Sequence, residues 1–285
     1  MSDNTVVGWD GSPEADLALT WAVARAEAEQ DGILLIDIED TETAAPGRVV
    51  TPQMVGERHV AADAEAKRVM AEHRGLRIST HVLAGDRVAE LRRFTRPDTL
   101  TVVGTGRRTR PHSRYRWSIG ARLAAVADGA VAVVPGLPAE DRSAVVVGVD
   151  GSDVSMKAAR FAAREARRLR GELRLVHAWA EPVVASRPLG IDPQFLDDVR
   201  EENRRLLESA ARTIRGANPD LVVSASLVHG APHDALAESL DDACLLVVGT
   251  EQTHGIERLL LGSVSHAMIL DITVPTIVVS PGALV

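Results

Sequence analysis

The sequence contains two copies of one unit, and this repeat constrains the fold more than any other feature. Val6–Ser12 returns as Val146–Ser152 at an offset of 140 residues, and Val102–Thr105 returns as Val247–Thr250 at an offset of 145. A repeat of this length in a chain of 285 residues indicates two similar domains. The predicted division is a first domain at residues 1–136, a linker at 137–142 and a second domain at 143–285.

Within each copy, short apolar runs alternate with helical stretches. Runs such as Val145–Val147 and Leu245–Val248 are bounded by Gly, Asp or Pro, which is typical of strands buried on both faces of a parallel sheet. Asp192–Arg215 carries its apolar residues on one side, as an amphipathic helix does. The alternation predicts an α/β, Rossmann-like fold, in which each domain has a five-stranded, mostly parallel sheet and four flanking helices.

Helix ends and edge strands can also be predicted. Ser12 and Ser152 stand where an N-cap would start the first helix of each copy, and Gly171 stands where a C-terminal glycine would end the second of these helices. The last strands, Val131–Val134 and Thr276–Val279, are apolar, and an exposed apolar edge strand invites pairing. We therefore expect these two strands to pair, so that the domains form an intrachain pseudo-dimer.

The composition excludes several classes of function. A net charge of −8 and an aromatic content of 3% argue against binding to nucleic acid or to an anionic membrane. The only lysines, Lys67 and Lys157, do not follow a glycine-rich turn, which excludes a P-loop. A single cysteine, Cys244, and the lack of a signal peptide or a long apolar run predict a reduced, soluble, cytoplasmic protein.

Candidate binding residues follow the ends of strands. In open α/β sheets, ligands bind beyond the carboxyl ends of the strands. Asp10 and Asp150 end the first strand of each copy, and Gly249 follows the fourth strand of the second copy. Gly262–Ser265 stands where the last helix would begin, and the N–H groups of such a helix start favour phosphate. Each aspartate also fits a second interpretation, as a turn residue beside Gly-Ser.

These residues resemble the universal stress protein family. The resemblance covers both copies and includes Val149–Ser152, Leu260–Ser265 and Val274–Val279. Nucleotide-binding members of that family carry G-x2-G-x9-G-[ST] after the fourth strand. The resemblance implies α/β domains with a five-stranded, mostly parallel sheet, dimerisation through the last strand and, in some members, ATP binding.

The second copy keeps the spacing of this motif but loses one of its glycines. Gln252 takes the place of the second glycine, between Gly249 and Gly262. Glu251 adds a negative charge and Gln252 adds a side chain where glycine would allow close approach, so retention and loss of binding both stay open. By resemblance, adenine would lie at Asp150 and the backbone around Val176, the ribose at Gly249, and the phosphates of ATP, with Mg²⁺, at Gly262, Ser263, Val264 and Ser265.

The first copy departs further from the motif. Arg107 replaces the second glycine, Trp117 the third, and Gly120 stands where the second serine belongs. We predict that this copy binds no ATP in the family manner and that Asp10 is structural. The segment Arg107–Trp117 holds five arginines interleaved with two aromatic residues, which would either bind an anion or pair with acidic residues as a solvated loop.

The combined prediction is a universal stress protein that binds an adenine nucleotide in its second copy only, acts in stress response and forms a homodimer. It is predicted not to be an enzyme, because the sequence contains no catalytic triad or paired carboxylates, and His229 and His233 lack further ligands for a metal. One alternative is a nucleotide-free dimeric interaction scaffold, favoured by Gln252 and Trp117. The other is a weak nucleotide hydrolase or phosphotransferase, for which Asp150 is the only candidate group.

Overall fold

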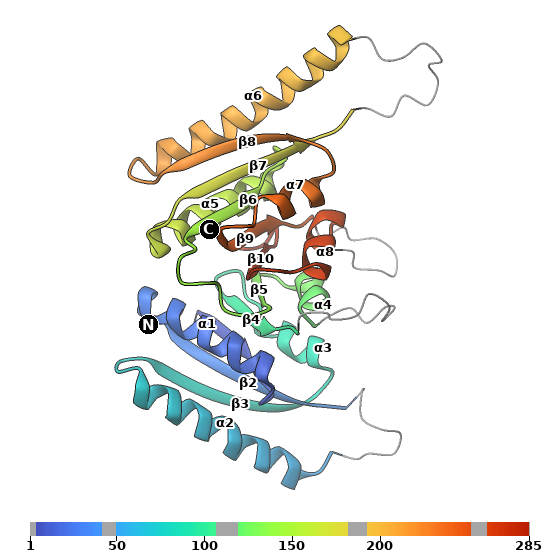
Figure 1. The fold of residues 1–285 in the computed structure, drawn as a ribbon. Coiled ribbons are helices and arrows are strands. Elements are labelled where there is room, and N and C mark those ends of the chain that lie inside the picture. Colours follow the sequence, from blue (N-terminus) through green and yellow to red (C-terminus); the bar gives the residue numbers. More distant parts are fainter. Residues whose placement is uncertain (1–3, 42–49, 107–118, 182–192, 252–260, 285) are drawn as a thin grey trace. The chain divides into compact units, whose positions relative to one another are not determined.

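The computed structural model describes residues 4–41, 50–106, 119–181, 193–251 and 261–284. In the described residues, strands and helices alternate along each sequence copy, and two strands follow one another where the copies join (Figure 1). The chain divides into two compact units, one formed by Met1–Leu137 together with Thr250–Val285, and the other by Pro138–Gly249.

The first unit is a sheet flanked by helices, with the strand order β3-β2-β1-β4-β5-β10. Neighbouring strands from β3 to β5 run parallel, and β10 runs antiparallel to β5. Helix α1 packs on β1 and β4, and α2 packs on β2 and β3. The elements are β1 (Thr5–Gly8), α1 (Pro13–Glu29), β2 (Gly32–Asp40), α2 (Pro52–Glu72), β3 (Arg77–Gly85), α3 (Arg87–Arg92), β4 (Leu100–Gly104), α4 (Ile119–Val126), β5 (Ala130–Val134), α8 (Ser263–Leu270) and β10 (Thr276–Val279).

The second unit repeats the central part of the first, with the parallel order β9-β6-β7-β8. Helix α5 packs on β6 and β9, and α6 packs on β7 and β8, as α1 and α2 do in the first unit. The elements are β6 (Ala144–Gly148), α5 (Asp153–Leu169), β7 (Leu173–Trp179), α6 (Pro193–Ala217), β8 (Val223–His229), α7 (Pro232–Glu238) and β9 (Ala243–Gly249). Among the described residues, each sequence copy thus supplies five strands and four helices, as predicted.

The cores combine aliphatic strand residues with the buried faces of the helices. Fully buried side chains of the strands include Val7, Ile33 and Val102 in the first unit and Val147 and Leu175 in the second. Their burial on both faces agrees with the continuous apolar runs in the sequence. None of the helices in the described ranges combines the length and apolarity that a bilayer crossing requires.

The helix starts follow the prediction, but one helix end does not. The Oγ atoms of Ser12 and Ser152 accept hydrogen bonds from the backbone N–H groups three residues later, which confirms both N-caps. At the end of α5, however, Arg170 adopts the left-handed conformation with φ of 53°, so the prediction for Gly171 is wrong. Glycine is needed at Gly171 for another reason, because a Cβ there would lie 1.9 Å from the carbonyl oxygen of Ser143.

The predicted pairing of the last strands is confirmed. In the antiparallel pair of β5 and β10, Ile277 lies opposite Ala132. Just beyond β10, the hydroxyl of Ser280 donates to the carbonyl oxygen of Asp128 at 2.8 Å. These contacts tie the end of the second copy to the first copy, and for this reason the compact units do not coincide with the sequence repeats.

Candidate functional site

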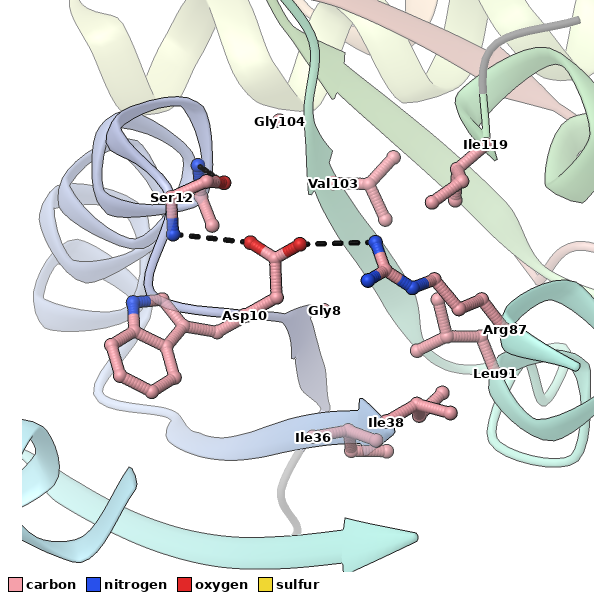
Figure 2. Close-up of a pocket in the computed structure, with 12 residues that line it drawn as sticks. Gly8, Asp10, Ser12, Ile36, Ile38, Arg87, Leu91, Val103, Gly104 and Ile119 are labelled. Atoms are coloured by element: carbon pink, nitrogen blue, oxygen red, sulfur yellow. Dashed lines mark hydrogen bonds and ion pairs between the residues drawn. The ribbon is translucent and has the colours of Figure 1, made fainter. Parts of the chain in front are cut away.

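A pocket of about 80 Å³ opens at the carboxyl ends of β1, β2 and β4 in the first unit (Figure 2). This is the edge where ligands bind in open α/β sheets. Aliphatic side chains surround a facing pair of charged groups, the carboxylate of Asp10 and the guanidinium of Arg87. The lining residues are Gly8, Trp9, Asp10, Ser12, Ala15, Ile36, Ile38, Arg87, Leu91, Val103, Gly104 and Ile119.

Asp10 is held by its own turn and by Arg87. Its Oδ1 accepts a hydrogen bond from the backbone N–H of Ser12 at 3.1 Å, and its Oδ2 accepts one from Nη1 of Arg87 at 3.0 Å. The Nε of Arg87 also lies 3.5 Å from Oδ2 of Asp40. Burial by itself would raise the pKa of Asp10, but the hydrogen bonds from Ser12 and the charge of Arg87 outweigh it and lower the pKa. Asp10 is therefore ionised at neutral pH.

Strand β2 carries a second ion-pair cluster, which lies close enough to Asp10 for their charges to interact. Asp37 and Glu39 are buried there, and Arg58 of α2 forms ion pairs with both carboxylates. Burial raises the pKa of Asp37, and the nearby charge of Asp10 adds to this effect, although the hydrogen bond from Arg58 opposes it. The carboxyl ends of β1 and β2 are thus electrostatically linked to each other and to α2.

The turn after β4 packs closely against the start of α1. A Cβ at Gly104 would lie 2.1 Å from the carbonyl oxygen of Glu14, so only glycine allows this approach. The carboxylate of Glu14 also reaches the next glycine, since its Oε1 lies 3.2 Å from the position of a Cβ at Gly106. A negative charge therefore lies at the turn that corresponds to Gly249 of the second copy, where the resemblance places the ribose.

We expect the variants Asp10→Asn and Asp37→Asn to change the pH dependence of stability in opposite directions. Because the pKa of Asp10 lies below its ordinary 3.8, its ionisation stabilises the fold at neutral pH, and this contribution is lost as the pH falls through the lowered value. The raised pKa of Asp37 has the reverse effect, so its contribution is present at low pH and lost as the pH rises through the raised value.

Urea unfolding between pH 7 and pH 3 measures both effects. The free energy of unfolding that Asp10→Asn loses relative to wild type should shrink on acidification, whereas the loss caused by Asp37→Asn should grow. Parallel curves for the two variants would contradict the assignment.

In the second copy, Asp150 occupies the position equivalent to Asp10 but has different partners. Its Oδ1 accepts hydrogen bonds from the backbone N–H of Ser152 at 2.9 Å and from the Ser152 hydroxyl at 2.6 Å. Burial would raise the pKa of Asp150, but these hydrogen bonds outweigh it and lower the pKa. Pro232 begins α7 where Arg87 begins α3. Within the described ranges, no arginine is paired with Asp150.

Val176 and its neighbour His177 lie on β7, next to Asp150. The carbonyl oxygen of Val176 accepts a hydrogen bond from the N–H of Val149 at 2.9 Å, which continues the pairing of β6 and β7. The buried imidazole of His177 contacts the carbonyl oxygen of Val149 and Oδ1 of Asn203, each at 2.7 Å. Helix α6 is thereby tied to the carboxyl end of β7.

The residues proposed for the phosphates lie at the start of α8. Gly262 is the N-cap of this helix and provides no side-chain cap, and its N–H lies 3.4 Å from the Oγ1 of Thr250. Ser263 is exposed, Val264 is half-buried and Ser265 is buried. These residues belong to the first compact unit, whereas Asp150, Val176 and Gly249 belong to the second. Gln252 and the segment Arg107–Trp117 lie outside the described residues.

Two charged residues were missed in the sequence, namely Arg87, which lines the first pocket, and Glu14, which borders the turn after β4. Both could have been noticed by aligning the copies, because Pro232 stands at the position of Arg87 and Val154 at that of Glu14. No group of three or more His, Cys, Asp or Glu side chains within the described ranges is placed to hold a metal ion.

The fold and these positions define a class of protein. It is an α/β protein built from two copies of one unit, with candidate ligand positions at the carboxyl ends of parallel strands. A family model described as the universal stress protein family matches residues 1–135 and 142–280. The chain therefore belongs to the universal stress protein family.

Known proteins resemble the chain over its whole length. Two universal stress proteins of Mycobacterium tuberculosis are 29% and 27% identical to it, and each match covers 96% of this chain and 95% of the relative. The crystal structure of a universal stress protein from Archaeoglobus fulgidus matches with a TM-score of 0.72 and 17% identity, covering 98% of this chain and 99% of that one. At this identity the structural match establishes the shared fold.

Proposed function

We propose that the second copy binds an adenine nucleotide, with its phosphates at Gly262–Ser265, and that this binding serves a role in stress response. The observation that carries the proposal is the start of α8, which combines a glycine N-cap with neighbouring hydroxyl groups. The spacing between Gly249 and Gly262, which is that of the family motif, supports the same ligand.

The start of α8 has the chemistry that a phosphate requires. With glycine as N-cap, no side chain of that residue caps the helix, and the helix dipole favours negative charge at this end. The hydroxyls of Ser265 and Thr250 both lie 4.0 Å from the position of a Cβ at Gly262. Hydroxyl donors therefore stand close to the glycine, and among the described residues no other side chain, apart from those of its chain neighbours, comes within 4 Å of that Cβ position.

Differences between the copies favour the second one as the nucleotide site. Asp10 is paired with Arg87 and Glu14 brings a carboxylate to the turn after β4, whereas the second copy has Pro232 and Val154 at these positions. Asp150 remains ionised and can accept a hydrogen bond from a ligand amino or hydroxyl group. Glu251, which is exposed, adds a negative charge. Mg²⁺ bound mainly by phosphates and water would offset that charge.

The experiment is to denature the purified protein, identify any adenine nucleotide released, and titrate the native protein with ATP and Mg²⁺ by calorimetry. A released nucleotide, or saturable binding of one nucleotide per chain, is the expected result. If no nucleotide is released and no binding is detected at millimolar ATP, the proposal is wrong. The nucleotide-free interaction scaffold is then the favoured alternative. Phosphate release under the same conditions tests the hydrolase alternative, and sedimentation tests the predicted homodimer.

A further inference from the structure

We propose that the pocket of the first copy is a separate site, which takes a small apolar molecule carrying one protonated amine. This inference goes beyond the proposed function, because it concerns the other copy and a ligand of opposite charge. It depends on the apolar walls of the pocket, on the unused acceptor capacity of Asp10, and on the carboxylates around it.

The walls of the pocket are mostly aliphatic, with Trp9 as the one aromatic lining residue. Figure 2 shows the side chains of Ile36, Ile38, Leu91, Val103 and Ile119 gathered around the two charged groups. The volume of about 80 Å³ is well below the roughly 300–1,000 Å³ of pockets that enclose drug-sized ligands. The pocket therefore suits a short hydrocarbon group rather than a whole nucleotide, and burial of that group in aliphatic walls is favourable.

Asp10 supplies the polar end of the site. An ionised carboxylate offers about four acceptor positions. The hydrogen bonds of the Asp10 side chain come from the backbone N–H and the hydroxyl of Ser12 and from Arg87, and they use three of these positions. The side chain is 31% exposed, so a ligand can reach it from solvent, and its lowered pKa keeps it charged at neutral pH. An ammonium group carries three donors and no acceptor, so one of its N–H groups can donate to the remaining position.

Among the described residues, the charges around the pocket favour a cation over an anion. Asp10 and Asp40 both face the guanidinium of Arg87, and the carboxylate of Glu14 lies at the turn that borders the pocket. The charge of Arg58 also reaches Asp10, but Arg58 is already paired with two carboxylates of β2. An ammonium group placed near Asp10 gains from this arrangement, whereas a carboxylate or phosphate is repelled by it. Arg87 opposes the cation, so its removal should strengthen binding.

Three probes with the same four-carbon chain test the proposal, namely butylamine (protonated at pH 7), 1-butanol and butyrate. Each is titrated into the full chain while NMR follows the amide signals of Gly8 and Gly104 and the indole N–H of Trp9. Butylammonium is expected to bind at millimolar concentration, about fivefold or more tightly than either of the other probes. Equal or tighter binding of butyrate, or shifts confined to signals outside the pocket, would overturn the proposal.

Two variants of opposite expected effect sharpen the test. Asp10→Asn should remove the preference for butylammonium, whereas Arg87→Gln should increase its affinity. Asp150→Asn is the matched control in the second copy and should leave the binding of butylammonium to the first copy unchanged. An unchanged preference in Asp10→Asn, a weaker affinity in Arg87→Gln, or an equal effect of Asp150→Asn would each refute the site. Unaltered signals elsewhere in the spectra check that the variants are folded, and failure of ATP binding by the second copy leaves this test unaffected.

Discussion

Gly262→Arg is expected to weaken ATP binding by about 100-fold or more. The arginine side chain would begin at the N-cap of α8, within 4.0 Å of the hydroxyls of Thr250 and Ser265, and would fill the space proposed for the phosphates. Its positive charge alone would attract ATP, so a loss of affinity reports on shape rather than on charge. Calorimetric titration with ATP and Mg²⁺ measures the effect.

Gly136→Arg is the control for this variant. It introduces the same charge, and no heavy atom outside its own neighbours lies within 4 Å of the Cβ that it would carry. It should therefore bind ATP as the wild type does. If both variants lose affinity equally, or if Gly262→Arg binds normally, the phosphates do not lie at the start of α8.

Ile277→Asp is expected to produce the largest loss of stability, about 4 kcal/mol or more. Ile277 is fully buried in β10, opposite Ala132 of β5. The substitution removes an aliphatic side chain from a packed core and places a carboxylate there without a partner. The first transition in urea unfolding, followed by circular dichroism, measures the loss, because two compact units need not unfold together.

Val222→Asp serves as the comparison. Val222 is 67% exposed, so an aspartate there should change the free energy of unfolding by no more than about 0.5 kcal/mol. A small loss in Ile277→Asp, similar to that of Val222→Asp, would mean that the β5–β10 pairing contributes little to the stability of the first unit.

Much of the fold was accessible from local features of the sequence. The alternation of apolar runs and amphipathic stretches predicted the strands and helices, and the serines before α1 and α5 predicted their caps, because each of these signals acts over a few neighbouring residues. The glycine after α5 was misread, since its requirement comes from the backbone of Ser143, which is distant in sequence. A local sequence pattern does not show that two separate segments of the chain approach each other closely.

The candidate sites show the same division. Asp10 was identified from its place after a strand, but its role could not be, because Arg87 stands 77 residues further along the chain and meets it only at the edge of the folded sheet. Likewise, a turn glycine at Gly104 is visible in the sequence, whereas the carboxylate that borders that turn comes from the start of α1.

The order of residues was sufficient to define a duplicated α/β chain, the family to which it belongs and the motif positions of the second copy, since repeats and spacings are properties of the chain itself. The sequence also predicted the β5–β10 pair. Only the tertiary structure decided that Thr250–Val285 falls in one compact unit with the first copy, and that the first copy holds a pocket with Asp10 facing Arg87. Both features arise where segments from separate parts of the chain meet. The charge and the shape of the pocket, and the extent of the unit, depend on residues that are far apart in the sequence.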